Sequence, residues 1–247
     1  MAAMRSNSRA AVFSLLLPAF LLTIISFALF GVFLWRGPFP IAHLNLTTPQ
    51  VLAFDTMLAV AFFVQHSGMV RRSFRARMAH AIPAHTQGAV YAIVSGIVLL
   101  LLPLFWQPTR VDLVTLHSPL RWLIRAAFLA GIAGMIAGIA SLKHFDALGA
   151  DSLLARVREK PATAMPLTIR GAYRWVRHPI YSSLILMVWA SPDVTADRLL
   201  FNLLWSVWMV VATRLEERDL AADFGEAYRD YQRRIPMLLP NSLRPRA

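Results

Sequence analysis

Residues Arg170–Tyr181 read R-G-A-Y-R-W-V-R-H-P-I-Y and lie between long apolar runs. Three arginines, a histidine, two tyrosines and a tryptophan fall within these twelve residues. Polar groups beside a membrane are costly unless they bind something, so one interpretation is a ligand-binding segment. The other is a basic loop that only orients the next helix. The apolar runs around the segment determine the fold class.

Four long apolar runs precede the segment, at residues 10–35, 51–70, 88–105 and 121–142. Each is long enough for a helix to cross, with some tilt, the roughly 30 Å hydrocarbon core of a bilayer. The first run is too long for a cleaved signal peptide, and no small-x-small site follows it cleanly. We therefore predict that it is a retained membrane span.

Two shorter apolar runs follow, at residues 180–190 and 199–213, and neither easily spans a bilayer alone. Together they predict a helical hairpin with its turn at residues 192–197. From Leu215 to Tyr231 apolar residues recur at helical spacing among charged ones, as in an amphipathic helix on a membrane surface. The predicted fold is an all-α integral membrane protein with about six transmembrane or membrane-embedded helices, including the C-terminal hairpin, plus a cytoplasmic amphipathic helix.

Composition supports this fold class. Of 247 residues 57% are hydrophobic and 15% charged, and the mean hydropathy is +0.53. The net charge of +12 could indicate a nucleic-acid partner, but the basic residues fall in short blocks between apolar runs, so none is expected. Cysteine is absent, which excludes disulfides, thiolate metal sites and a catalytic cysteine. No two histidines have His-x-x-x-His spacing, and no metal site is predicted.

The distribution of basic residues predicts the orientation. With the N-terminus inside and six crossings, the inside segments carry twenty Lys and Arg residues and the outside loops carry four. This asymmetry follows the positive-inside rule. Both termini and the Arg170–Tyr181 segment are therefore expected to face the cytoplasm of a multi-pass protein, in a bacterial inner membrane.

Small residues recur every four positions in the fourth run, at Ala126, Ala130, Gly134 and Gly138. Such a stripe lets another helix approach closely. A glycine-rich nucleotide loop is the rival interpretation, but no strand precedes the stripe and no G-x-G occurs.

Three single residues near the span ends carry further expectations. Trp106 and Trp122 flank one loop, as aromatic residues at the membrane interface do. Asp55 is expected to be a helix-start or interfacial residue and not a catalytic one.

The hairpin brings two polar pairs to the same membrane face. A hairpin returns to the side it left, so Arg177-His178 at its start should lie beside Glu216-Glu217 at its end. The two carboxylates could form a structural ion-pair clamp, or they could hold a ligand that carries positive charge and hydroxyl groups. Aromatic faces at Tyr173, Trp175 and Tyr181 favour the ligand, because they attract a sulfonium or ammonium group by roughly 1 kcal/mol.

At this point a family resemblance is visible. The segment 171–181 is followed by the hairpin, then by E-E-R-D-L at 216–220, F-G-x-x-Y-x-x-Y at 224–231 and I-P-M-L-L-P at 235–240. This order resembles the isoprenylcysteine carboxyl methyltransferase-like superfamily of membrane enzymes that use S-adenosylmethionine (SAM). The motifs Q-H-S-G-M at 65–69, F-W-Q-P at 105–108, H-F-D at 144–146 and S-P-D-V-T at 191–195 look most like the methanethiol S-methyltransferase group, with NnrU-like proteins second.

The resemblance implies a division into a four-span N-terminal bundle, residues 1–142, and a SAM-binding catalytic half, residues 143–247. It implies that the SAM pocket is lined by Gly171, Tyr173, Arg177, His178, Pro179 and Tyr181. Glu216 and Glu217 would bind the ribose hydroxyls and the amino group of SAM, because carboxylates accept hydrogen bonds from both. Arg177 and His178 are also candidate catalytic residues. Tyr228 and Tyr231 could cover the site or pack the core.

The methyl acceptor is expected to be a small or membrane-soluble thiol. Since the thiolate is the nucleophile, His66 in the second span is the candidate to orient or deprotonate it, and a histidine that only hydrogen-bonds between helices is the alternative. Other acceptors that stay open are an isoprenylcysteine carboxylate and a lipid. An NnrU-like protein, an NADPH-dependent membrane reductase and a transporter are the remaining alternatives.

Overall fold

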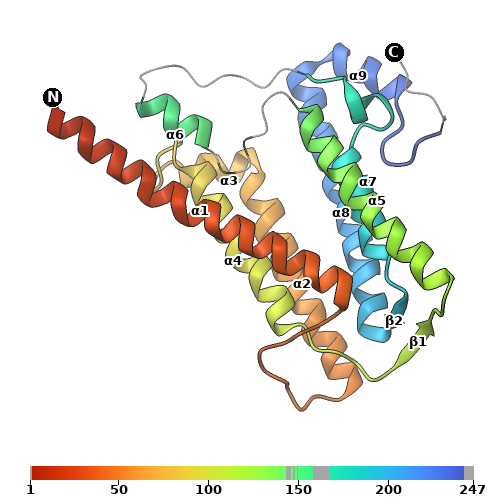
Figure 1. Cartoon of the computed structure of the whole chain (residues 1–247). Helices are drawn as coiled ribbons and strands as arrows, with labels where there is room; N and C mark the ends of the chain where they lie inside the picture. The colour runs from red at the N-terminus through yellow and green to blue at the C-terminus, as the bar shows by residue number, and fades with distance from the viewer. Residues whose placement is uncertain (1, 143–145, 147, 149, 158–166, 242–247) are drawn as a thin grey trace. The chain divides into compact units, whose positions relative to one another are not determined.

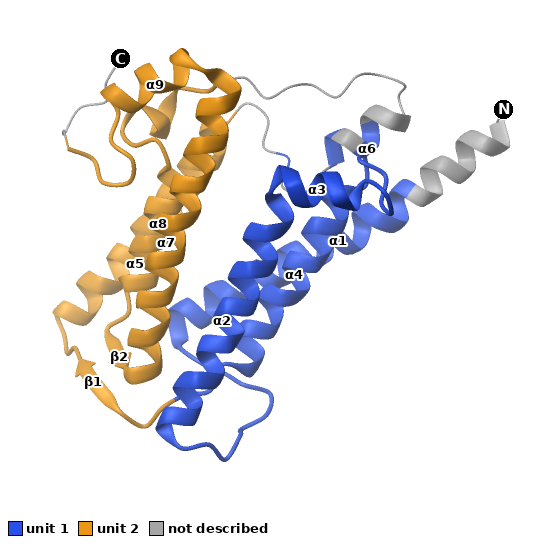
Figure 2. Cartoon of the chain, turned by 180° about the vertical axis from the view of Figure 1, so that it is seen from behind, with its two compact units in different colours: residues 1–108, 146–164 blue, residues 109–145, 165–247 orange. Residues whose placement is uncertain are grey.

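The computed structural model describes residues 2–142, 146, 148, 150–157 and 167–241 (Figure 1). The chain forms two compact units, residues 1–108 with 146–164 and residues 109–145 with 165–247 (Figure 2). The predicted division at residue 142 is a different one, because it separates a helical bundle from a catalytic half by role. It stays a prediction. By packing, the fourth predicted span belongs to the second unit. His144 and Phe145 of the H-F-D motif lie outside the described residues.

The first unit contains the helices α1 (Ala2–Arg36), α2 (Thr48–Val70), α3 (Arg72–Met78), α4 (Gln87–Phe105) and α6 (Ala150–Val157). Helix α4 packs against both α1 and α2. Helix α2 begins after Thr47, whose backbone N–H donates to the Gln50 side chain at 2.9 Å, and this satisfies a donor at the helix start. Its end is set by Arg71, which is extended (φ −65°, ψ 138°).

The two central residues of the F-W-Q-P turn, Trp106 and Gln107, are buried in the first unit. Trp106 is fully buried with its ring 6.0 Å from that of Phe33, so it packs inside the first unit and is not exposed as an interfacial aromatic would be. Asp55 is also fully buried, and its carboxylate accepts from the backbone N–H of Gln107 at 3.0 Å. Burial without a hydrogen bond would be costly, so Asp55 holds the turn instead of starting a helix. Trp122, by contrast, is 69% exposed, as expected of an interfacial aromatic.

The second unit contains β1 (Asp112–Thr115), α5 (Leu120–Ser141), the 3₁₀ turn η1 (Gly171–Arg174), α7 (Pro179–Trp189), β2 (Asp193–Thr195), α8 (Ala196–Phe224) and α9 (Glu226–Arg234). Strands β1 and β2 pair antiparallel, with Asp112 opposite Thr195. An ion pair of 2.5 Å joins Arg121 of α5 to Asp193 of β2. The sequence reasoning did not predict this ribbon, because its strands are too short to show a period of two.

Helices α5 and α7 pack closely through small residues of α5. A Cβ atom built at Gly138 would lie 2.9 Å from the Ile180 side chain, and one at Gly134 would lie 2.6 Å from the Ser183 hydroxyl. The predicted close approach of another helix to this stripe is therefore confirmed. Gly131, which the four-residue spacing did not include, also lies in this close contact with α7.

Helix α8 is longer than predicted. The second arm of the hairpin was expected to end at Thr213, but the helix continues through the two glutamates to Phe224. Strong helix formers fill residues 214–222 except Asp219, and the chain reaches its first helix breaker at Gly225, which has φ +57°. The predicted amphipathic helix is thus divided, and its C-terminal part is the short helix α9.

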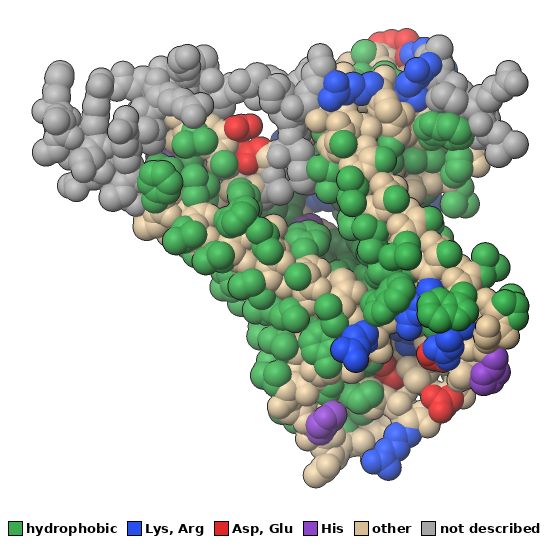
Figure 3. All heavy atoms as spheres, in the orientation of Figure 1, with side chains coloured by type: hydrophobic (Ala, Val, Ile, Leu, Met, Phe, Trp, Pro, Cys, Tyr) green, Lys and Arg blue, Asp and Glu red, His purple; other side chains and the backbone are tan. Residues whose placement is uncertain are grey.

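Within the described residues, five helices are long and apolar enough to cross a membrane: α1 from Val12, α2, α4, α5 and α8. The apolar helix α7 is shorter, so it can be membrane-embedded, as expected of a hairpin arm. Large hydrophobic side chains are exposed along these helices, for example Phe13 at 69% and Met57 at 66%. On the face drawn in Figure 3, hydrophobic side chains cover the bodies of α1 and α5. These features confirm an all-helical, multi-pass integral membrane protein.

Candidate functional site

Arg177 and Glu217 form the centre of the site in the second unit. The Arg177 Nε atom lies 2.6 Å from Glu217 Oε1, and both side chains are about nine-tenths buried, with 10% and 12% exposed. His178 Nε2 lies 3.2 Å from the same carboxylate oxygen. The residues just before α7 and the C-terminal third of α8 therefore meet, as the hairpin predicted.

The Arg177 guanidinium also binds the backbone at the end of α9. Its NH1 group donates to the backbone carbonyls of Gln232, at 3.0 Å, and of Ile235. The backbone N–H groups of Arg177 and His178 donate to the carbonyls of Pro236 and Met237 at 2.9 and 3.1 Å. The I-P-M-L-L-P motif is therefore bound along the segment that opened the sequence analysis.

The two adjacent glutamates have different surroundings. Glu217 Oε1 accepts from Arg177 and His178, and its Oε2 accepts from the Gln232 side chain at 3.2 Å. Glu216 makes no hydrogen bond or ion pair among the described residues, and its side chain is half-buried. Of the two interpretations of the pair, Glu217 fits the structural clamp, whereas Glu216 keeps a carboxylate available for a ligand.

Tyr173 lies near enough to Glu216 for the charge of this available carboxylate to act on its hydroxyl. Burial raises the pKa of Tyr173 to about 12, and the negative charge of Glu216 adds to the rise. Its hydroxyl therefore stays protonated, and able to donate, at any physiological pH. The Tyr173 carbonyl accepts from the Tyr231 hydroxyl at 2.6 Å, which fixes the 3₁₀ turn on α9.

Tyr228 and Tyr231 form a core cluster with Ile235, and each is at least 97% buried. Burial raises the pKa of both tyrosines. Of the two roles considered for them, covering the site or packing the core, the structure favours packing.

Gly171 and Pro179 have local structural reasons for their identity. Gly171 has φ +54°, and a Cβ atom there would collide with the Ser141 side chain of α5. The Ser141 hydroxyl instead accepts from the Ala172 N–H at 3.0 Å. Pro179 is the first residue of α7, where its missing N–H costs nothing. Both residues shape the backbone around the clamp.

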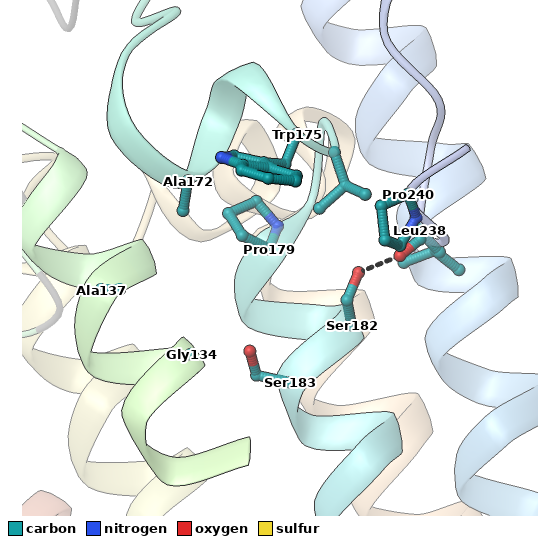
Figure 4. A pocket seen from close by; sticks show the side chains of 10 residues that line it. Gly134, Ala137, Ala172, Trp175, Pro179, Ser182, Ser183, Leu238 and Pro240 are labelled. Carbon is teal, nitrogen blue, oxygen red and sulfur yellow. Dashed lines mark hydrogen bonds between the residues drawn. The ribbon is translucent and has the colours of Figure 1, made fainter. Parts of the chain in front are cut away.

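A cavity of about 400 Å³ lies on the face of α7 that carries Pro179, Ser182 and Ser183 (Figure 4). Gly134 and Ala137 of α5 form another wall, and Trp175 lies beside Pro179. The Ser182 hydroxyl donates to the Leu238 carbonyl at 2.6 Å. Tyr181 is two residues from Pro179 and so lies on the opposite side of the helix, where its ring is 5.9 Å from that of His178.

His66 belongs to the first unit, where it bridges α2 and α4. The Tyr91 hydroxyl lies 2.9 Å from His66 Nε2, and the two ring centres are 5.3 Å apart. Next to it, the Gln65 amide donates to the Ser95 hydroxyl at 3.0 Å. The interhelical hydrogen bond expected of a structural histidine is thus present.

Sequence reasoning missed several residues that complete the site: Ser141, Ser182, Gln232 and the carbonyls of residues 235–238. Serine and glutamine carry little signal alone, because they occur on any polar surface. The I-P-M-L-L-P motif was the one sequence signal that could have pointed to these carbonyls. It marked the segment but did not show which residues bind it. No group of three metal-ligating side chains occurs within the described residues.

Comparison with known proteins decides the family. A methanethiol S-methyltransferase of Pseudomonas sp. (strain GM41(2012)) is 35% identical over 201 residues, which cover 79% of this chain and 76% of that protein. The protein of the same name from Mycobacterium tuberculosis (strain ATCC 25618 / H37Rv) is 33% identical over 192 residues, or 77% and 79% of the two chains. This chain belongs to the methanethiol S-methyltransferase family.

Membership of the methanethiol S-methyltransferase family confirms the resemblance inferred from the motifs and the expected enzyme class, a methyltransferase. A more distant relative is the Nurim homolog of Drosophila pseudoobscura pseudoobscura, 26% identical over 178 residues that cover 69% of this chain. No protein-family model matches the chain. No solved structure matches it either.

Proposed function

We propose that this protein is a SAM-dependent methyltransferase that methylates a small thiol of the methanethiol type. The observation that carries the proposal is the contrast between Glu216 and Glu217. In a chain of this family, a clamped glutamate is preceded by an available one whose charge acts on Tyr173. The clamp makes the site rigid, and the available carboxylate gives it a ligand-binding group.

The residues present fit SAM. Glu216 offers two acceptor oxygens for ribose hydroxyls or an amino group, and its negative charge suits a cationic ligand. The aromatic face of Tyr173, near Glu216, would attract a sulfonium, and Tyr181, whose ring lies 5.9 Å from that of His178, offers a second aromatic face. When bound, SAM supplies a methyl group that is already activated on its sulfur. The chain's own residues then have to position the reactants and exclude water.

The clamp residues are positioning residues in this proposal. Arg177 and His178 neutralise Glu217 and hold the segment 236–238, so the backbone around the cofactor site keeps one conformation. Preorganisation of this kind reduces the entropy lost on binding. Both residues were catalytic candidates from the sequence. Their contacts favour a role in holding the site, without direct contact with the reactants.

In the proposed orientation both termini, the clamp and Glu216 face the cytoplasm, where SAM is available. The basic residues on that side support this arrangement. The membrane is proposed to be a bacterial inner membrane, and an apolar thiol would reach the site through it.

The test is methyl transfer by purified protein with methyl-labelled SAM. Methanethiol, longer alkanethiols, an isoprenylcysteine carboxylate and a phospholipid amine are offered in parallel, and headspace and lipid fractions are analysed separately. We expect label in the headspace as dimethyl sulfide. Label in the lipid fraction alone would support a lipid or isoprenylcysteine acceptor instead. NADPH oxidation without any methylation would contradict the proposal.

His66 is proposed to orient or deprotonate the thiol, with Tyr91 holding its ring. Removal of a positioned acid–base group costs roughly 10²- to 10⁴-fold in rate. We therefore expect His66→Phe to lower kcat/KM for the thiol by about 100-fold or more, with an unchanged Kd for SAM. Tyr91→Phe should cause a smaller loss of roughly tenfold and shift the pH profile.

The alternative role for His66 makes a different prediction. If the histidine only joins α2 to α4, both variants lower the melting temperature, while the folded fraction keeps its kcat/KM. Activity measured per folded protein therefore separates the two roles.

A further inference from the structure

We propose that helix α3 binds the headgroups of anionic phospholipids. This inference does not depend on the methyltransferase proposal, because it concerns a surface of the first unit. The segment 71–77 reads R-R-S-F-R-A-R and follows the apolar helix α2 directly. Clusters of basic residues immediately beside a membrane span attract anionic lipids.

Helix α3 has no buried residue. Arg72, Arg75 and Arg77 are all exposed, and Phe74 between them is 38% exposed. An isolated helix of seven residues gains little from its own hydrogen bonds in water. A helix that combines arginines with an exposed aromatic residue fits the boundary between lipid headgroups and acyl chains.

The position of α3 is fixed by α4. The Gln87 side chain, which is 95% buried, donates to the carbonyls of Arg75 and Ile82 at 3.0 and 3.3 Å. Its carbonyl oxygen lies 3.4 Å from Arg75 Nε. The helix is therefore held beside the C-terminal end of α2 and the N-terminal end of α4, where the two apolar spans stop. Its arginines lie there as a group.

Charge balance distinguishes α3 from the other basic helix, α9. In α9, Arg233 pairs with Glu226 at 2.7 Å and also with Asp230, and Arg229 lies 3.4 Å from Glu226. No Asp or Glu occurs anywhere between residues 56 and 111. Among the described residues, no carboxylate forms an ion pair with Arg75 or Arg77. Arg75 and Arg77 thus carry charges that no described carboxylate balances, and the phosphate of a lipid headgroup beside the end of α2 would supply the counter-charge.

The test is lipid retention by native mass spectrometry of the purified full-length protein, titrated with phosphatidylglycerol or with phosphatidylcholine. We expect wild-type protein to retain phosphatidylglycerol preferentially. Because each arginine near an anionic surface contributes about 1 kcal/mol, R75Q/R77Q should weaken that retention by roughly tenfold or more. The charge-conserving variant R75K/R77K should keep most of it.

The matched control is R36Q/R110Q, which removes the same charge from two exposed arginines that stand alone in the sequence. It should retain phosphatidylglycerol like the wild type. Equal retention of the two lipids by wild-type protein would overturn the proposal, and so would equal losses in the control and in R75Q/R77Q. Melting temperatures measured for all variants show that each is folded.

Discussion

Replacing Arg177 by methionine is expected to destabilise the protein more than any other single change at the site. The substitution keeps much of the side-chain volume but leaves Glu217 as a buried charge with only His178 and Gln232 as partners. It also removes the donors for the carbonyls of Gln232 and Ile235. Breaking one partner of a buried pair costs about 3–5 kcal/mol in the free energy of unfolding.

The measurement is unfolding of the purified protein in detergent, by denaturant titration or by thermal melting. Arg218→Met is the matched control, because Arg218 is an exposed arginine next to Glu217 on the same helix. It should change the free energy of unfolding by less than about 0.5 kcal/mol. In a double-mutant cycle, Arg177→Met with Glu217→Gln should be less destabilising than the sum of the two single changes. Strict additivity would show that the pair does not interact.

Replacing Glu216 by glutamine is expected to have the largest effect on cofactor affinity. The change removes the negative charge and one acceptor oxygen but leaves the clamp intact, since Glu216 has no partner among the described residues. A hydrogen bond to a charged group contributes roughly 1.5–3 kcal/mol, so the Kd for SAM should rise by about 10- to 100-fold. Calorimetric titration with SAM measures this Kd.

Glu217→Gln is the comparison that separates the two carboxylates. It should lower the melting temperature, because Arg177 and His178 lose their charged partner. Glu216→Gln should leave the melting temperature near that of the wild type. If the two variants lose the same stability and the same affinity, the glutamates act as one unit and the proposed division of roles is wrong.

The apolar pattern along the chain was sufficient to predict the membrane helices to within a few residues. Residues 88–105 were predicted as a span and α4 covers Gln87–Phe105, and residues 121–142 correspond to α5 at Leu120–Ser141. Bilayer thickness constrains such helices strongly, so length and hydropathy carry the information. The end of α8 was less well predicted, because the mostly charged residues 214–219 resemble a surface segment although most of them are good helix formers.

The approach of Arg177-His178 to the glutamate pair, made in the structure through Glu217, was also predictable. A hairpin must return to its starting side, so residues that flank its two arms become neighbours. The spacing alone could not show which of Glu216 and Glu217 faces the arginine, because residues adjacent in a helix differ by about 100° in direction. That choice depends on how α8 is rotated against α7, which packing decides.

The sequence by itself determined the membrane class, the hairpin and the family, because hydrophobic periodicity and short motifs are local properties of the chain. Only the tertiary structure decided that Trp106 is buried, that Gly171 makes room for Ser141, and that Arg177 binds the carbonyls of residues 232 and 235. These contacts join residues far apart in the chain. Backbone carbonyls occur at every residue, so no sequence pattern shows which of them a buried guanidinium will bind.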